Sequence, residues 1–219
     1  MRPPGRYRIG LNDLGRSSAR EGPSPEVPRW APQRDQCLRT RTAEISETLG
    51  VDVFDAVRTV LATRGYRADP VPEEVIERIV EAGRLTGSGG NTQPWHFVVV
   101  TDRDTIQRLG RMLRTGPYVS GAPLAVVVAV DRSSRLAESD ASRAIQSMIL
   151  TAWGEGVGSN WVGFGGLQEV ASLLRIPDNL DVLAVLPFGY PLSAEMQGRK
   201  ARKPMGEVAS RGVYGQPLQ

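Results

Sequence analysis

A glycine-rich loop that runs directly into a strand constrains this chain more than any other stretch. Residues 86–101 read TGSGGNTQPWHFVVVT. The glycines among residues 87–90 permit backbone angles closed to residues with a Cβ, so a ligand can approach the main chain closely. Asn91 and Gln93 add amide donors and acceptors, and Pro94 favours an extended start to the strand. The stretch therefore predicts either an ordinary turn before a core strand or a loop that holds a flat ligand along one edge.

The flanking sequence predicts helices on both sides of a sheet. The continuous apolar run at 123–130 is typical of a strand buried on both faces. Further strands are expected at 95–101 and 180–188, and helical periodicity is found at 53–62, 72–86, 104–115, 139–155 and 168–174. This alternation of helices with non-local strands indicates a layered α+β domain.

Two of these helices carry apolar residues in a pattern that predicts where they lie. In the 53–62 segment Phe54, Val57, Val60 and Leu61 share one helical face. The 139–155 segment is apolar over much of its circumference. We expect it to be buried, either in the core or in a subunit interface.

The scarcity of cysteine and histidine excludes several kinds of chemistry. Cys37 is the single cysteine, so neither an internal disulfide nor a multi-cysteine metal site is possible within one chain. His96 is the single histidine, which leaves a histidine-based zinc site short of ligands. We expect no metal site, and we interpret His96 as structural because it falls in the predicted strand.

Residues 1–43 differ in composition from the remainder of the chain. They hold nine arginines and four acidic residues, whereas residues 44–219 hold 18 basic and 20 acidic ones. Six of the sixteen prolines also fall there. We predict a basic, proline-rich, flexible arm at 1–43 and a folded domain at 44–219. The alternative is that the arm lies over a binding pocket.

The charge and hydropathy patterns also bear on partners. Because the domain is slightly acidic, a nucleic-acid role would depend on the arm alone, and we expect none. No apolar run is long enough to span a membrane, and no signal-peptide pattern is present, so a cytoplasmic location is expected.

A resemblance to a known family sharpens this interpretation. The segment Asn91–Phe97, NTQPWHF, resembles the N-x-Q-P-W-x-F signature of the FMN-dependent nitroreductase family. Three further features appear in the family's order: a helix entry at 69–74, Gly-Tyr-Pro at 189–191 and Lys-Ala-Arg-Lys-Pro at 200–204. The resemblance covers roughly residues 53–215. It implies a three-layer α-β-α fold with a central, mainly antiparallel sheet, a homodimer, and FMN as cofactor.

The resemblance also implies which residues bind the cofactor. It assigns the phosphate and ribityl contacts to Arg64, Lys200 and Arg202. It assigns the flavin edge to a loop partly supplied by the partner subunit, and the surroundings of the flavin N5 to a second glycine-rich loop. The first loop contributes Ser88, Gly90 and Asn91, and the second contributes Gly163, Phe164 and Gly165. No catalytic side chain is implied, because the flavin itself carries the hydride chemistry.

One departure from the family pattern bears on function. Relatives commonly carry an arginine and a serine shortly before the position of Arg64, where this chain has Val60-Leu61-Ala62. The leading hypothesis is an oxidoreductase that passes hydride from NAD(P)H to nitroaromatics, quinones or other electron-poor acceptors. The alternatives are a specialised member, acting in flavin cleavage, dehalogenation or deazaflavin use, a flavin-binding protein without turnover, and, last, a basic-tailed interaction protein.

Overall fold

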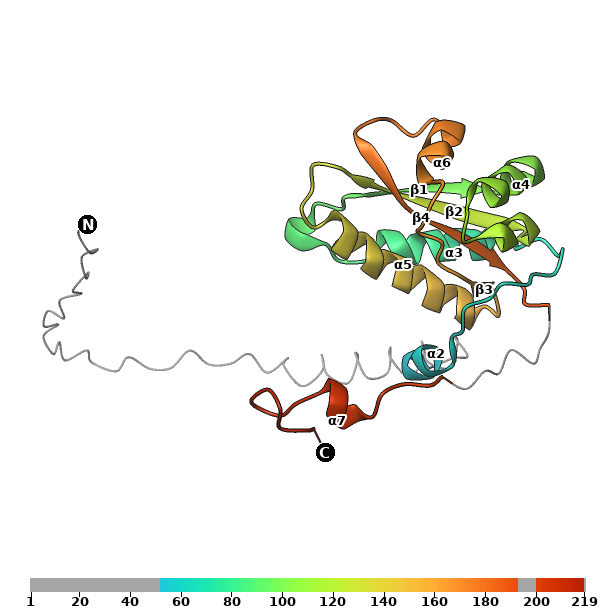
Figure 1. Ribbon diagram of the computed structural model, residues 1–219. Helices are drawn as coiled ribbons and strands as arrows, with labels where there is room; N and C mark the ends of the chain where they lie inside the picture. The colour runs from blue at the N-terminus through green and yellow to red at the C-terminus, as the bar shows by residue number, and fades with distance from the viewer. Residues whose placement is uncertain (1–51, 193–199, 219) are drawn as a thin grey trace, which may run out of the picture. The chain divides into compact units, whose positions relative to one another are not determined.

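The computed structural model describes residues 52–192 and 200–218, which belong to one compact unit of the chain (Figure 1). The predicted arm at 1–43 and its boundary with the domain lie outside the described residues. The helices are α2 (Val53–Thr59), α3 (Glu73–Arg84), α4 (Arg103–Met112), α5 (Ala137–Gly154), α6 (Leu167–Leu174) and α7 (Met205–Val208), with short 3-10 turns η1 (Gly89–Asn91) and η2 (Pro117–Gly121). The strands are β1 (Trp95–Val100), β2 (Leu124–Asp131), β3 (Gly158–Ser159) and β4 (Leu180–Gly189).

The four strands of the described chain form one antiparallel sheet in the order β1-β2-β4-β3. β2 lies between β1 and β4, and its residues Leu124–Ala129 are inaccessible to solvent. Such burial on both faces confirms the prediction made from its continuous apolar sequence.

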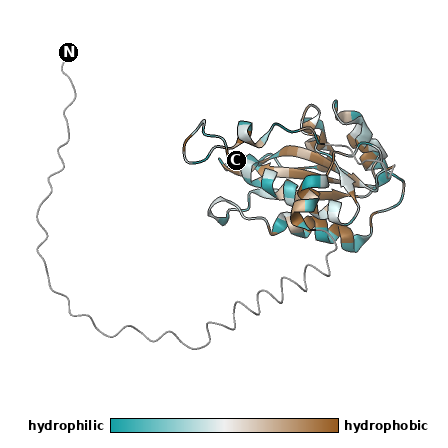
Figure 2. Ribbon diagram, turned by 90° about the horizontal axis from the view of Figure 1, so that it is seen from below, coloured by the Kyte–Doolittle hydropathy of each residue, from teal (hydrophilic) through white to brown (hydrophobic). Residues whose placement is uncertain are grey.

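Helices cover both faces of this sheet, as Figure 1 shows. On one face α3 and α5 pack against Leu124, Val126 and Val128 of β2. On the other face α4 and α6 pack against Ala125 and Val127. Figure 2 shows the resulting contrast between brown strands and helices that carry both hydrophilic and hydrophobic residues. The predicted α+β fold with three layers and an antiparallel sheet is confirmed.

The apolar surface of α5 is buried within its own chain. The sequence leaves open whether this helix faces the core or a second subunit. Ala141, Ala144, Ile145, Met148 and Ala152 are all inaccessible in the single chain, and most of them belong to the core beneath the sheet. Consequently this stripe does not by itself require a partner, and a case for dimerisation must come from other residues.

The helix predicted at 53–62 ends at Thr59, so the sequence placed its end wrongly. Asp52 caps α2 by accepting hydrogen bonds from the backbone N–H groups of Phe54 and Asp55. At the other end Val60 is extended, and Ala62 forms a parallel bridge with Ser159 of β3. Pairing with a strand far along the chain outweighs local helical periodicity here. The predicted apolar face is also not buried, since Phe54 is 70% exposed.

No helix in the described part of the chain is both long and apolar enough to cross a bilayer. Within the same residues no three His, Cys, Asp or Glu side chains lie close enough together to hold a metal ion.

Candidate functional site

A cavity of about 350 Å³ lies where the end of α2, the middle of α5 and the loop after β3 meet the basic segment near residue 200. Its volume is within the range of about 300–1,000 Å³ that small-molecule sites commonly have. One wall is apolar and consists of Val57, Val60, Leu61, Ala62 and Ile149. The polar lining consists of Gln146, Ser159, Asn160, Trp161, Lys200 and Arg202. None of these described lining residues is acidic, so the cavity favours an anionic ligand.

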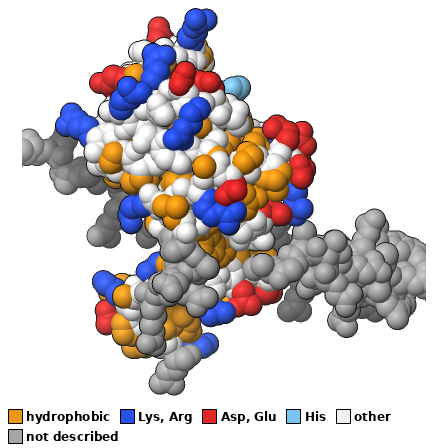
Figure 3. Space-filling model, turned by 90° about the vertical axis from the view of Figure 1, so that its right-hand side faces the viewer, with side chains coloured by type: hydrophobic (Ala, Val, Ile, Leu, Met, Phe, Trp, Pro, Cys, Tyr) orange, Lys and Arg blue, Asp and Glu red, His pale blue; other side chains and the backbone are white. Residues whose placement is uncertain are grey.

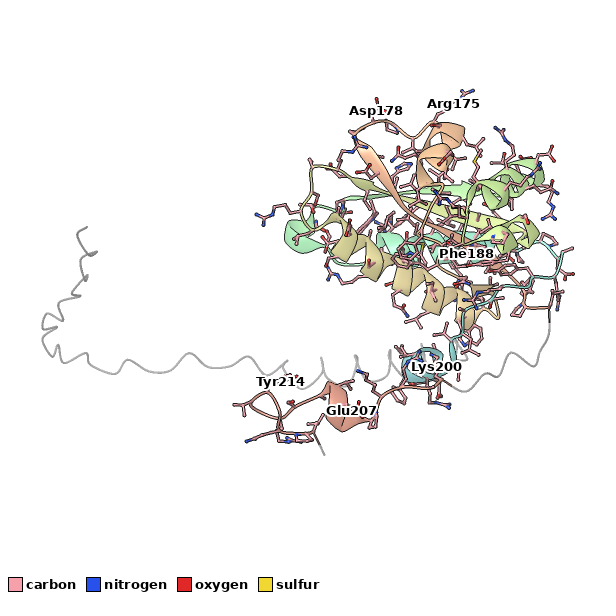
Figure 4. The ribbon with its side chains drawn as sticks, viewed as in Figure 1. Arg175, Asp178, Phe188, Lys200, Glu207 and Tyr214 are labelled. Carbon is pink, nitrogen blue, oxygen red and sulfur yellow. The ribbon has the colours of Figure 1, made fainter. Side chains whose placement is uncertain are left out.

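Lys200 and Arg202 supply the positive charge of the cavity. Lys200 is half-buried, and its Nζ donates a 2.6 Å hydrogen bond to the carbonyl oxygen of Val57 on α2 (Figure 4). Burial, and then repulsion from Arg202, lower the pKa of Lys200. Arg202 is exposed and donates to the backbone oxygen of Ala201. Both cations retain free donors, and an anion between them would relieve their mutual repulsion.

Asn160 and Trp161 line the cavity directly after Ser159, which pairs with Ala62. The Asn160 Oδ1 accepts a 2.8 Å hydrogen bond from the backbone N–H of Trp161. The Nδ2 of the same side chain is buried and has no protein partner in the described chain. Gly163 accommodates the neighbouring indole, because a Cβ at this position would come within 2.7 Å of the Trp161 Nε1. A buried amide without an acceptor is uncommon in proteins.

The predicted flavin-edge loop lies elsewhere, at the start of α5. Its backbone is left-handed at Gly90 (φ 58°), Asn91 (φ 55°) and Gln93 (φ 48°). The last two are unusual for residues with a Cβ. The loop is held by the Ser88 hydroxyl, which accepts from Gln93 N–H, and by Asp140 of α5, whose Oδ2 accepts from Gly89 N–H at 2.9 Å. Conformations of this kind persist only where surrounding contacts fix them.

Asp140 fixes this loop from a buried position, and its charge is balanced by Arg143. The hydrogen bond from Arg143, followed by that from Gly89 N–H, holds the pKa of Asp140 below its usual range. We expect Asp140→Asn to lower the melting temperature (Tm) by several degrees at pH 7. Asparagine turns an N–H group towards Arg143 or towards Gly89 and so leaves two donors facing each other.

The pH dependence of this effect has a definite sign. A carboxyl whose pKa is depressed on folding stabilises the protein above its unfolded pKa of about 4, and this stabilisation disappears as the pH falls through the folded pKa. The Tm difference between wild type and Asp140→Asn should therefore shrink below pH 4 in scanning calorimetry. Asp178→Asn, on an exposed turn (Figure 4), is the matched control and should change little. A constant Tm difference from pH 7 to pH 3 would contradict this role.

The second predicted loop and Arg64 contribute less directly to the cavity. The Phe164 carbonyl accepts from the Thr115 hydroxyl, and the Phe164 ring is 76% exposed. Gly165 packs against Arg114, beyond the end of α4. The guanidinium carbon of Arg64 lies 5.9 Å from the centre of the Tyr118 ring. None of these residues lines the cavity.

The structure therefore separates the predicted site residues into groups. Lys200 and Arg202 share the cavity with the 60–62 segment that departs from the family pattern. Ser88, Gly90 and Asn91 lie near Asp140, whereas the cavity meets α5 at Gln146 and Ile149, six and nine residues, or roughly 9 and 14 Å, further along the helix. Sequence reasoning missed Gln146 and Asn160. The one available signal for Asn160 was a lone amide directly before the Trp161–Gly166 loop.

The fold and the cavity together define an α+β protein with a pocket whose described lining is basic and free of carboxylates. Comparison with known proteins identifies its family. The nitroreductase family matches residues 58–131 and 112–190. A protein of Methanothermobacter thermautotrophicus, provisionally named an NADH dehydrogenase/NAD(P)H nitroreductase, is 32% identical over 149 residues, which cover 64% of this chain and 78% of the relative. The chain belongs to the nitroreductase family, and the resemblance seen in the sequence is confirmed.

Solved structures agree with this assignment. A nitroreductase-like protein from Desulfovibrio desulfuricans, crystallised in complex with FMN, superposes with a TM-score of 0.66 at 28% identity, covering 77% of this chain and 99% of that one. A similar protein from Bacteroides thetaiotaomicron, provisionally named like the archaeal relative, gives a TM-score of 0.69 at 28% identity, with coverages of 75% and 99%.

Proposed function

We propose that this protein is an FMN-dependent oxidoreductase that takes hydride from NAD(P)H and delivers it to nitroaromatics, quinones or other electron-poor acceptors. The observation that carries the proposal is the cavity at the end of α2, where Lys200 and Arg202 face a space whose described lining residues include no carboxylate. The names of relatives also support an FMN-dependent oxidoreductase. One of them is an FMN reductase of Bacillus subtilis that is 23% identical over 187 residues.

The residues of the cavity fit FMN. Its phosphate requires cationic or N–H donors, which Lys200 and Arg202 offer from one segment. Its polyol chain requires neutral donors and acceptors, which Gln146 and Ser159 offer. The apolar wall excludes water from one side of the ligand. When bound, FMN supplies the hydride chemistry, and the protein supplies position and electrostatics.

The separation of the predicted contacts supports a homodimer as the functional unit. Within one chain the loop that carries Asn91 contacts the start of α5, whereas Lys200 lines the cavity beside the middle of that helix. A second copy could bring its own loop to the cavity of the first. Exposed apolar side chains on α2, on the loop after β3 and near α7 are available for such an interface: Phe54, Val57, Phe164, Met205 and Val208. Figure 3 shows apolar patches between the charged side chains on one face of the molecule.

A spectroscopic experiment tests the proposed function. We expect the purified full-length protein, mixed with FMN and freed of excess, to retain flavin absorbance in the visible range. Anaerobic NADPH or NADH should bleach that absorbance, and a nitroaromatic or quinone should restore it. Retained colour that neither nucleotide bleaches would favour a flavin-binding protein without turnover. A protein that retains no flavin would overturn the proposal.

A further inference from the structure

A basic and aromatic surface adjoins the cavity, where the second glycine-rich loop meets the segment after α4. Gly116 packs directly on the loop, since a Cβ at this position would lie 2.7 Å from the Val162 Cγ1. The Thr115 hydroxyl donates to the Phe164 carbonyl at 3.2 Å. These contacts fix the segment after α4 against the loop. Because the same loop begins at Trp161, which lines the cavity, a ligand that leaves the cavity past this indole meets the surface next.

Two arginines on this surface are not neutralised by the fold. A Cβ built on Gly165 would lie 3.4 Å from the Arg114 Nε, so the guanidinium end of Arg114 lies beside the backbone of the loop. The guanidinium of Arg64 lies over the ring of Tyr118, in the turn that follows. Both arginines are exposed, and neither forms an ion pair with a described residue. Their donors therefore remain available to an anion from outside the chain.

Exposed aromatic rings accompany these charges. The Phe164 ring is 76% exposed, and Trp161 is 37% exposed. Exposed aromatic faces stack on flat bases, and arginine binds phosphate through two parallel N–H groups. A ligand that combines a flat base with a phosphate dianion matches both features. Nucleotides have this combination.

The proposed reaction requires a nucleotide besides FMN. With its phosphate at Lys200 and Arg202, the flavin would extend its ring away from the basic segment, and the nicotinamide would have to meet that ring. A cavity of about 350 Å³ is at the lower end of the range for one small ligand, so it cannot also enclose a dinucleotide. The adenosine half of the reductant must therefore lie outside the cavity, on a surface that adjoins it.

We propose that Arg114 is a specificity-determining residue that binds the 2′-phosphate of NADPH and so selects NADPH over NADH. The proposal rests on the function proposed above. The 2′-phosphate is the group that distinguishes the two reductants, and it belongs to the adenosine ribose, far from the nicotinamide. Arg114 has the position that this requires, because it is exposed, unpaired in the described chain and outside the cavity. It touches no reacting atom and acts through binding alone.

Arg114→Gln tests this role, because it keeps a hydrogen-bonding side chain and removes the charge. In steady-state assays of the FMN-loaded full chain with a quinone acceptor, KM for NADPH should rise about tenfold and kcat should change little. KM for NADH should stay within about twofold of wild type. Arg114→Lys restores a point charge and should recover part of the loss. Arg108→Gln, which removes an exposed arginine from the middle of α4, is the matched control and should leave both reductants unaffected.

A binding measurement without hydride transfer makes the test independent of turnover. Adenosine 2′,5′-bisphosphate carries the 2′-phosphate, whereas AMP lacks it. In isothermal titration calorimetry wild type should bind the bisphosphate more tightly than AMP, and this preference should disappear in Arg114→Gln and shrink with added salt.

The possible outcomes separate this inference from the proposed function. A wild type that uses NADPH and NADH equally well, or an Arg114→Gln variant in which both KM values rise equally, would overturn the inference and leave the flavin oxidoreductase intact. A flavin that neither nucleotide reduces would overturn the proposed function. The selective binding of the bisphosphate through Arg114 would still show a 2′-phosphate site, and its absence would overturn both.

Discussion

Arg202→Ala is expected to weaken FMN binding about ten- to a hundredfold at low salt. A charge-assisted hydrogen bond contributes about 1.5–3 kcal/mol, and about 1.4 kcal/mol corresponds to a tenfold change in affinity. In this chain few other groups can compensate for the lost contact. Among the described lining residues only Lys200 is a second cation, and the 60–62 segment is apolar. Fluorescence titration of the purified protein with FMN measures the loss directly.

The salt and ligand dependence of this variant identify the contact. Arg202 is exposed, so raising the ionic strength should weaken wild-type binding and reduce the difference between the two proteins. Riboflavin should bind wild type and Arg202→Ala equally. Lys203→Ala is the matched control, since Lys203 is exposed in the same segment but does not line the cavity. Equal losses of FMN and riboflavin would show that Arg202 is structural and that the phosphate lies elsewhere.

Phe54→Glu is expected to convert a dimer into monomers and to abolish most FMN binding. Phe54 is 70% exposed on α2, next to the cavity wall formed by Val57. A carboxylate in the first turn of α2 suits the helix dipole, so the helix itself should not be destabilised. Burying that charge in an interface without a partner would be strongly unfavourable. The variant should therefore fold but fail to associate.

Sedimentation velocity at low micromolar concentration measures the outcome. Wild type should sediment as a dimer, as expected if the interface buries more than about 2,000 Å². Ser172→Glu introduces the same charge at an exposed position of α6, on the other face of the sheet, and should leave the dimer unchanged. A wild-type monomer that still retains FMN would refute the dimer proposal.

Most of the fold could be predicted from sequence because its signals are local or strongly apolar. The run at 123–130 allowed one interpretation, a strand buried on both faces, and β2 matches it. Helix α4 begins at Arg103, one residue before the predicted segment 104–115, and Asp102 caps it by accepting from Thr105 N–H. The end of α2 could not be predicted, because the bridge between Ala62 and Ser159 joins residues nearly one hundred positions apart.

The candidate site was less accessible to sequence reasoning for a similar reason. Lys200 and Arg202 were found through a motif, and their position in one cavity with residues 57–62 accords with that interpretation. Asn160 carries no motif, and only the structure places it in the lining of the cavity, with its Oδ1 accepting from the Trp161 N–H. For α5 the sequence left two alternatives open, because its apolar stripe is compatible with either the core or a subunit interface. Only the packing against the sheet shows that the core accounts for it.

The central position of β2 also has a consequence during synthesis. Its sequence LAVVVAV is uncharged, rich in β-branched residues and free of proline, which are the attributes of segments that aggregate when left unpaired. One of its edges can pair with β1 as soon as β2 is made, but the other must wait for β4, whose first residue follows Asp131 by 49 positions. At about 5–20 residues per second this delay lasts roughly 2–10 s, during which the nascent chain presents an open apolar edge. Production of this protein should therefore depend on translation speed and on chaperones that shield that edge more than on the stability of the finished fold.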